Sequence, residues 1–283
     1  MGLHVKKSVW VSNWVWIVVI CCCIHRISAF QTGTILCRPH RISQTEPQQE
    51  QQMNNVVSAR QRQMNNVVSA RFVSPSGIDE LPNMYQASVF IGIYVMLTVA
   101  TIPTIKSIDA LSNTMGLERW RNTFVDTSLP LLLGLFYVCA GIGHFALADS
   151  FKDIYPPIGT WGIWYLPGSA TFHVAWTGAV EALGGGGLLY GAIRNLLGME
   201  EDYDHTAISK LVLPLSALAL FALTIVVTPA NIYMYTHGAT MGDMGPLHLS
   251  FHYVRFAVQV LILGLLFAIA KDSFFFAWGD ELD

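Results

Sequence analysis

The chain has 283 residues, of which 53% are hydrophobic and only 12% are charged, and its net charge is −3 at pH 7. Soluble proteins carry about 25% charged residues, so this composition excludes an ordinary water-soluble protein and indicates that lipid surrounds most of the chain. A slightly acidic chain has no basic surface to neutralise phosphates, which argues against a nucleic-acid partner.

Residues 1–29 have the pattern of a secretory signal peptide. Basic residues precede an apolar stretch at 9–24, and Ser28 and Ala29, small enough for signal peptidase, end the segment. The apolar stretch has about 16 residues, whereas a membrane span needs about 20. A retained membrane anchor is therefore the weaker interpretation.

Residues 30–80 predict a disordered segment like a transit peptide. Up to Arg71 the segment is rich in Arg, Gln and Asn, and the sequence QMNNVVSAR occurs twice, at 52–60 and at 63–71. This repeat is too polar to bury a core, so it does not predict a repeat fold.

The join between these two segments bears on localisation. Ser28-Ala29-Phe30 resembles the boundary between signal and transit peptide in plastid proteins of algae with complex plastids. The resemblance implies an integral protein of a plastid membrane, either the thylakoid or the inner envelope. The alternative is a protein of the endomembrane system or plasma membrane with a disordered stalk.

The remaining sequence predicts a bundle of membrane-spanning helices. In lipid a segment can satisfy its own backbone only as a helix, and short connections favour antiparallel neighbours. Pro229 predicts a kink where the fourth helix runs on towards Tyr235. The glycines of the third segment predict close helix contacts. Five segments have the required length and apolarity, namely 85–105, 129–147, 171–193, 208–228 and 249–270.

The connecting loops predict the orientation. One side of the membrane holds six basic residues and the opposite loops hold only Lys152, so the first side is expected to face the stroma or cytosol. On the lumenal side, the loop 156–168 carries Trp161, Trp164 and Tyr165, which are expected to lie flat at the headgroup level. The six basic residues are Lys106, Arg119, Arg121, Arg194, Lys210 and Lys271.

Two charged residues lie inside predicted spans at a similar depth, Glu181 in the third and Arg255 in the fifth. An unpaired charge at that depth costs on the order of 2.5 to 3.5 kcal/mol on insertion scales. We therefore expect Glu181 and Arg255 to form an ion pair.

Further polar residues gather at the same end of the helices, and three interpretations compete for them. In the first, they hydrogen-bond across helices and fix the bundle. In the second, they line a lumen-facing cavity for a small or amphipathic molecule such as a quinone headgroup, with a histidine that can pass a proton. In the third, His248 and His252, four residues apart, ligate a metal or haem, which is a weak signal without a third ligand. The residues involved are His144, His173, Asn231, His252 and Gln259, besides Glu181 and Arg255.

The chain resembles the DoxX-like family of four-helix membrane proteins. The resemblance covers about 129–270, and its motifs follow the family's order across four helices. They are AGIGHF at 140–145, followed by Asp149, Phe151 and Pro156, then GAVEALGG at 178–185, TPANIYM at 228–234, and Arg255 with Gln259.

This resemblance implies an all-α membrane protein with an antiparallel four-helix transmembrane bundle at 127–272. The transmembrane helix at 84–106 is then an addition that follows the disordered N-terminal region. Members of the family have been linked to quinone-coupled oxidation of sulfur compounds and to thiol redox homeostasis. With Cys139 alone beyond the predicted presequence, this chain cannot run a dithiol cycle by itself.

Two functional hypotheses remain. The first is a redox-associated membrane protein with a polar pocket for a quinone or other small ligand, acting if at all as a subunit of a quinone-linked oxidoreductase. The second is a non-catalytic structural or assembly subunit that binds other subunits of a membrane complex through its helix faces.

Overall fold

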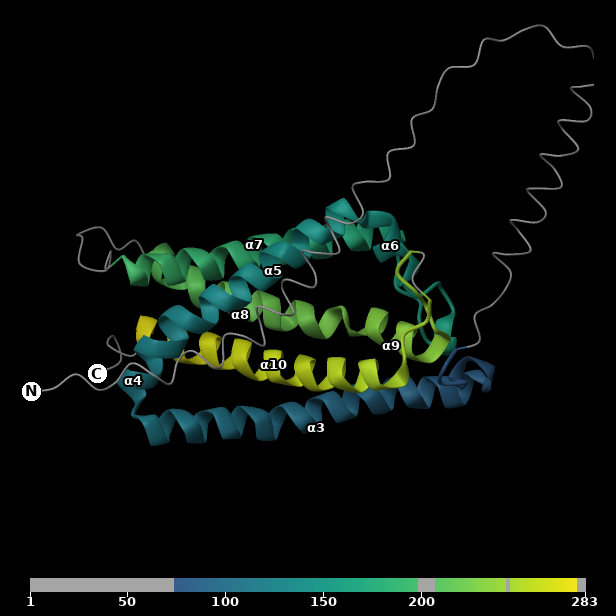
Figure 1. The fold of residues 1–283 in the computed structure, drawn as a ribbon, viewed down its shortest axis with the longest axis horizontal. Coiled ribbons are helices and arrows are strands. Elements are labelled where there is room, and N and C mark those ends of the chain that lie inside the picture. The colour runs from purple at the N-terminus through teal and green to yellow at the C-terminus, as the bar shows by residue number, and fades with distance from the viewer. Residues whose placement is uncertain (1–73, 198–206, 243–244, 279–283) are drawn as a thin grey trace, which may run out of the picture. The chain divides into compact units, whose positions relative to one another are not determined.

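A computed structural model describes residues 74–197, 207–242 and 245–278 of the chain, and these residues form helices and no strands. The predicted signal peptide at 1–29 and the predicted disordered segment up to residue 73 lie outside the described residues. The described part is a bundle of long helices that run back and forth along one direction (Figure 1).

The long helices begin close to the predicted positions, but α3 and α10 run on well past the predicted ends of their spans. They are α3 (Asn83–Met115), α5 (Leu129–Ala146), α7 (Ala170–Leu196), α8 (Ala207–Val226) with its continuation α9 (Thr228–His237), and α10 (Leu249–Trp278). By length and composition, four stretches can cross a membrane: Asn83–Met115, Leu117–Ala146, Lys210–His237 and Leu249–Phe275. Helix α7 has the length for a span, but its four consecutive glycines and Glu181 make it less apolar than the others.

The connection between α3 and α5 is helical, although the sequence suggested a loop there. It consists of α4 (Leu117–Trp120) and a π-helical turn, η2 (Arg121–Ser128). Trp120 and Val125 are buried against Ile108 of α3 and Ala268 of α10. This local core explains why the segment folds back onto the bundle instead of extending into solvent.

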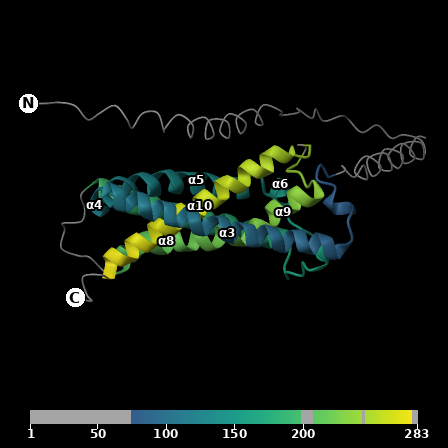
Figure 2. The ribbon, with the colours of Figure 1, turned by 90° about the horizontal axis from the view of Figure 1, so that it is seen from below.

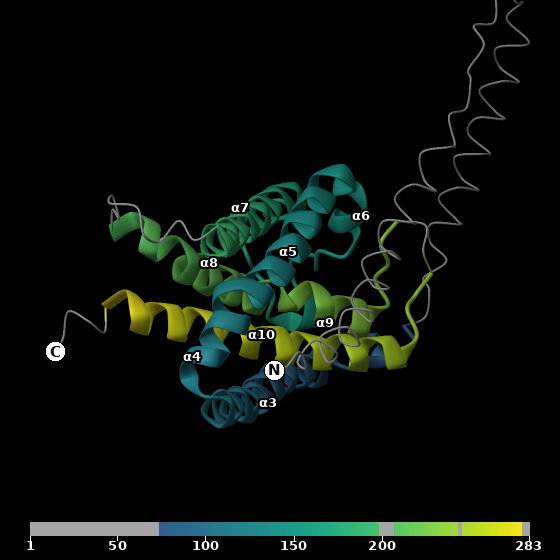
Figure 3. The same cartoon turned by 60° about the vertical axis from the view of Figure 1, so that its left-hand side comes forward.

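Helix α3 lies on the outside of the bundle and packs along α10 (Figures 2 and 3). The main core lies on the other side of α10, where apolar side chains of α5, α7, α8 and α10 meet. Leu97 of α3 packs with Val260 and Leu263 of α10. Most of the remaining α3 surface is exposed and apolar, as a lipid-facing helix requires.

The glycines of α7 bring it into close contact with α5 and α8. A β-carbon on Gly185 would lie 2.7 Å from the carbonyl oxygen of Gly134, and one on Gly178 would lie 2.5 Å from Cβ of His144. A β-carbon on Gly186 would meet no atom within 4 Å. The predicted use of these glycines for helix packing is therefore confirmed at Gly178 and Gly185 but does not apply to Gly186.

The predicted kink at Pro229 is present, and α3 helps to stabilise it. Helix α8 ends at Val226 and α9 begins at Thr228, with Pro229 in its first turn. Proline has no N–H, so the carbonyl of Ile225, four residues earlier, loses its usual helical donor. The hydroxyl of Tyr94 donates to this carbonyl at 3.2 Å.

Residues 74–80 correct one prediction, because they are ordered although the sequence placed them in a disordered segment. Ser74 is buried, and its hydroxyl donates to the carbonyl of Tyr235 at 3.4 Å. Ser76 donates in the same way to Thr236, and a 3-10 turn, η1 (Ile78–Glu80), leads into α3. The polar composition of residues 30–71 does not indicate the order of residues 74–80, which comes from their packing on α9.

The loop before α7 corrects a second prediction. It contains the short helix α6 (Ala148–Asp153) and a 3-10 turn, η3 (Thr160–Gly162). Trp161, expected at the headgroup level, is only 1% exposed, and its indole N–H donates to Thr236 Oγ1 at 3.0 Å. Its φ of 55° is unusual for a residue with a side chain, so burial and this hydrogen bond must hold it in place.

Candidate functional site

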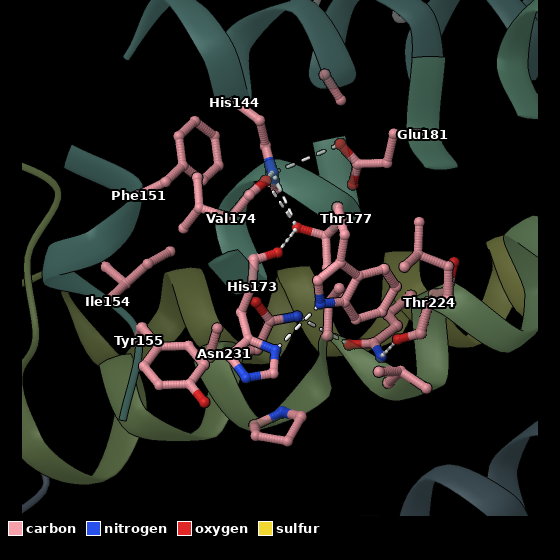
Figure 4. Close-up of a pocket in the computed structure, with 18 of the residues that line it drawn as sticks. His144, Phe151, Ile154, Tyr155, His173, Val174, Thr177, Glu181, Thr224 and Asn231 are labelled. Carbon is pink, nitrogen blue, oxygen red and sulfur yellow. Dashed lines mark hydrogen bonds and ion pairs between the residues drawn. The ribbon is translucent and has the colours of Figure 1, made fainter. Parts of the chain in front are cut away.

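A cavity of about 340 Å³ lies within the bundle at the end where α6 and α9 are found (Figure 4). Helices α5, α6, α7, α8, α9 and α10 and the loop before α7 all contribute to its lining. The structure brings together six of the polar residues selected from the sequence: His144, His173, Glu181, Asn231, Arg255 and Gln259. Apolar and aromatic side chains form the rest of the wall, as in most small-molecule sites.

Glu181 does not form the predicted ion pair with Arg255. The nearest charged or ionisable partner of its carboxylate is His144, whose Nε2 lies 3.5 Å from Oε2. The reason is the close contact of α5 and α7 at Gly178, which sets His144 beside Glu181. Arg255 comes from α10 on another side of the cavity, and its guanidinium makes no ion pair with any described carboxylate.

The hydrogen bonds of His144 fix where its protons lie. Its Nδ1 is 3.1 Å from the carbonyl oxygen of Val174, which can only accept, so Nδ1 carries a hydrogen. Nε2 faces the carboxyl group of Glu181. The 3.5 Å between Nε2 and Oε2 is an ion-pair distance without a hydrogen bond, and it brings two groups that can each hold a proton next to each other.

A proton bound by the pair sits on His144, as an imidazolium beside a carboxylate, or on Glu181, as a carboxylic acid beside a neutral imidazole. With that proton the pair has no net charge, and the proton can pass to a molecule in the cavity. Glu181 is 8% exposed, and its buried Oε2 has no hydrogen-bond partner within the described residues. Phe151 of α6 packs on His144, with ring centroids 3.9 Å apart, and limits the movement of the imidazole.

His173 has a structural role in the cavity wall. The indole N–H of Trp176 donates to its Nδ1 at 3.0 Å, so Nδ1 is unprotonated and Nε2 carries the hydrogen. Nε2 then donates to the carbonyl of Pro167 at 2.9 Å. With both nitrogens engaged, His173 is a poor proton carrier.

Tyr155 completes this part of the wall. Its ring stacks on His173, with centroids 5.0 Å apart. Burial raises the pKa of the Tyr155 phenol, so it stays a neutral hydroxyl that can donate a hydrogen bond.

Arg255 is the cation of the cavity. Its Nη1 donates to the sulfur of Met234 at 3.1 Å, and a thioether is a weak acceptor. A guanidinium has five N–H donors, and a single sulfur leaves most of them without a strong acceptor. The arrangement therefore favours an occupant with a carbonyl or anionic oxygen beside Arg255.

Gln259 and Asn231 form the hydrogen bonds across helices that the first interpretation predicted. Asn231 donates to Gln259 Oε1 at 3.2 Å, and Gln259 donates to Thr228 Oγ1 at 2.7 Å and to the carbonyl of Thr224 at 3.2 Å. The Tyr137 hydroxyl lies 2.6 Å from Thr224 Oγ1. The sequence reasoning missed Tyr137, Thr224 and Thr228, although the two threonines stand four residues apart just before Pro229.

The two histidines considered as metal ligands, His248 and His252, make other contacts and gain no third ligand among the described residues. His252 lines a neighbouring cavity and packs on Tyr235, with ring centroids 5.6 Å apart. His248 Nδ1 lies 2.9 Å from the hydroxyl of Ser250. Among the residues that the structure describes, no three His, Cys, Asp or Glu side chains are placed to hold a metal ion.

No family model, curated protein or solved structure matches the chain. The residues of the cavity therefore carry the functional conclusion. Chemically, the cavity offers hydrogen-bond donors on Arg255, one exchangeable proton on the His144–Glu181 pair, and apolar walls. Cys139 is exposed, free and outside the cavity lining, so no thiol contributes to it.

Proposed function

We propose that the chain is a DoxX-like integral membrane protein of a plastid membrane, the thylakoid or the inner envelope. Its lumen-facing cavity binds the headgroup of a quinone or of a chemically similar amphipathic molecule. The support comes from the predicted presequence, from the motifs shared with that family and from the residues of the cavity. The presequence, the motifs and the cavity can each be tested independently.

The proposal includes α7 as a fifth span, with α3 as an addition to a four-helix domain at 127–272. Helix α7 has 27 residues and so is about 40 Å long, more than the hydrocarbon core requires. Its glycines other than Gly186 lie in close contact with α5 and α8, and Glu181 is buried. A less apolar helix belongs at such an enclosed position in a membrane bundle.

The observation that carries the binding proposal is the placement of Arg255 and the His144–Glu181 pair around one apolar cavity. A buried polar group without a partner costs about 1 to 3 kcal/mol, and more if it is charged. A quinone can interact with both groups. Its carbonyl oxygens accept hydrogen bonds from the guanidinium of Arg255, and the hydroxyls of its reduced form can exchange protons with the His144–Glu181 pair. The aromatic wall suits a flat ring.

We propose that the chain has no redox cycle of its own. Among the described residues Cys139 is the one cysteine and is exposed, so it has no partner there for an internal disulfide. If the chain takes part in an oxidation, the quinone accepts the electrons and a partner subunit supplies the substrate. The role of the chain's own residues is then to bind the headgroup and to exchange a proton at Glu181 or His144.

The test is quinone binding to the purified chain in nanodiscs. Trp164 and Trp176 line the cavity, so binding of a short-chain benzoquinone is expected to quench tryptophan fluorescence. Arg255→Gln and Glu181→Gln are expected to weaken binding, whereas the matched exposed changes Arg119→Gln and Glu118→Gln leave it unchanged. Equal binding by all four variants would contradict the proposal.

The Gln259 network favours a second candidate, a structural or assembly subunit. Gln259 joins α10 to the α8–α9 kink through three hydrogen bonds and so fixes the bundle without any ligand. In this case Gln259→Leu and Arg255→Gln would both reduce accumulation of the protein, and no quinone would bind the wild-type chain.

A further inference from the structure

A second cavity, of about 350 Å³, lies between α3 and the helices α9 and α10. Its walls on α3 are Val89, Gly92, Ile93 and Met96, and opposite them lie Ile232 and Phe256. Further along α3, Leu97 already packs closely against α10. The additional helix thus covers α10 tightly over one part of its length and leaves room over another part.

The two cavities share a wall. Asn231, Arg255 and Gln259 line both of them. Asn231 and Gln259 hydrogen-bond to each other, so the guanidinium of Arg255 is the charged group at this boundary. A molecule that contacts Arg255 in the main cavity is therefore next to the second cavity.

The walls of the two cavities differ in chemistry. The main cavity contains the His144–Glu181 pair, which the second lacks. On its α3 side the second cavity presents only apolar side chains and a glycine, and on the opposite side Thr228 is already hydrogen-bonded to Gln259. Tyr235, His252 and Tyr253 also line that opposite side and contribute aromatic rings. One cavity thus suits a polar head and the other an apolar chain.

We infer that the cavity between α3 and α10 holds the isoprenoid or other hydrocarbon tail of the molecule whose headgroup occupies the main cavity. This inference rests on the proposed function, because it extends the quinone site past Arg255. It gives α3 a role in binding: the helix forms the far wall of the tail site.

Gly92 provides a direct way to fill the second cavity. A β-carbon there would meet no atom within 4 Å, so a Leu side chain at this position starts in open space and extends into the cavity that Gly92 lines. Gly186→Leu is the matched control, since Gly186 is also helical, also has open space around it and lines neither cavity.

The experiment compares two benzoquinones with the same head, one without an isoprenoid tail and one with a long tail. Both are measured by fluorescence quenching in nanodiscs, at known mole fractions in the bilayer. Gly92→Leu is expected to weaken binding of the long-tailed quinone by about tenfold, which corresponds to the burial of about two methylene groups. Binding of the tailless quinone by Gly92→Leu, and of both quinones by Gly186→Leu, should stay at the wild-type level.

The outcomes separate the two proposals. If the wild-type chain binds the tailless quinone but Gly92→Leu leaves long-tailed binding unchanged, the tail site is wrong and the headgroup site stands. If the wild-type chain binds neither quinone, both proposals fail. Loss of a co-purified membrane lipid in Gly92→Leu, with unchanged quinone binding, would assign the cavity to a lipid acyl chain and overturn the inference.

A second measurement does not depend on the stability of a variant. A quinone with a photoreactive diazirine near the middle of its tail is expected to label the α3 peptide that contains Gly92 and Met96. Labelling only on other helices would contradict the tail site.

Discussion

The two ends of the bundle treat their charged residues differently. At the end where α3 meets α4, Lys271 contacts Asp109 and lies 3.6 Å from Asp272, whose other oxygen accepts a hydrogen bond from Trp120. Inside the cavity at the other end, the described residues give Arg255 only the sulfur of Met234, and Glu181 stands 3.5 Å from His144 with no hydrogen bond to Oε2.

This difference suggests what each end is for. Paired charges at the first end fix the ends of α3 and α10 and require nothing further. The poorly paired groups at the cavity end are buried, where they destabilise the bundle unless a ligand or water supplies the missing contacts. A ligand site explains why such groups are retained inside a membrane protein.

The largest expected effect comes from the close packing of α7 against α5. Gly185→Leu would force a side chain into the backbone of α5, since even a β-carbon would lie 2.7 Å from Val138 N. We expect a loss of stability of about 3 kcal/mol or more, seen as loss of the folded protein on size-exclusion chromatography. Gly186→Leu should fold normally, and equal behaviour of the two variants would contradict the packing described here.

Changing one cation at each end, Arg255 or Lys271, tests the difference between the two ends. Arg255→Gln is expected to weaken binding of a short-chain benzoquinone by about 10- to 100-fold, because a charge-assisted hydrogen bond contributes about 1.5 to 3 kcal/mol. Its effect on the melting temperature should be small, since only a contact to sulfur is lost. A large drop in melting temperature with unchanged binding would assign Arg255 to the scaffold.

A moderate effect is expected at the kink that shapes the cavity. Tyr94→Phe removes the donor to the Ile225 carbonyl and should destabilise the protein by about 1 to 3 kcal/mol, measured by thermal unfolding in detergent. Tyr85→Phe is the control, because Tyr85 is largely exposed. If the two variants melt alike, the Tyr94 bond does not support the kink.

The smallest effect is expected for Lys271→Gln at the paired end. Its ion pairs with Asp109 and Asp272 are partly exposed, so their loss should cost at most about 1 kcal/mol and shift the melting temperature slightly. Quinone affinity should not change. A change in affinity would mean that the two ends are coupled and that the contrast drawn between them is wrong.

The helices could be predicted from the sequence because lipid imposes a length and an apolar composition on each segment. The limits of α5, for example, differ from the predicted span by a single residue. The charged and amide residues of the cavity were also predictable, because such side chains are rare within these segments and stand out in the sequence, whereas the hydroxyl groups of Tyr137 and Thr224 do not.

The pairing of those residues was not predictable in the same way. The similar depth of Glu181 and Arg255 in the membrane suggested an ion pair between them. The glycines, however, determine which helices approach most closely, and they bring α5 against α7. Similarly, Trp161 has the composition of an interfacial residue, yet its contacts with Thr236 and Phe90 are long-range and appear only in the folded chain.

The central claim is that Arg255 and the His144–Glu181 pair hold a quinone headgroup between them. Infrared difference spectroscopy of a benzoquinone with isotopically labelled carbonyls tests it most directly. We predict that binding to the wild-type chain shifts one carbonyl stretch to lower frequency, and that the shift is lost in Arg255→Gln. A carbonyl band that is the same in the wild-type chain, in Arg255→Gln and in lipid alone would contradict the claim.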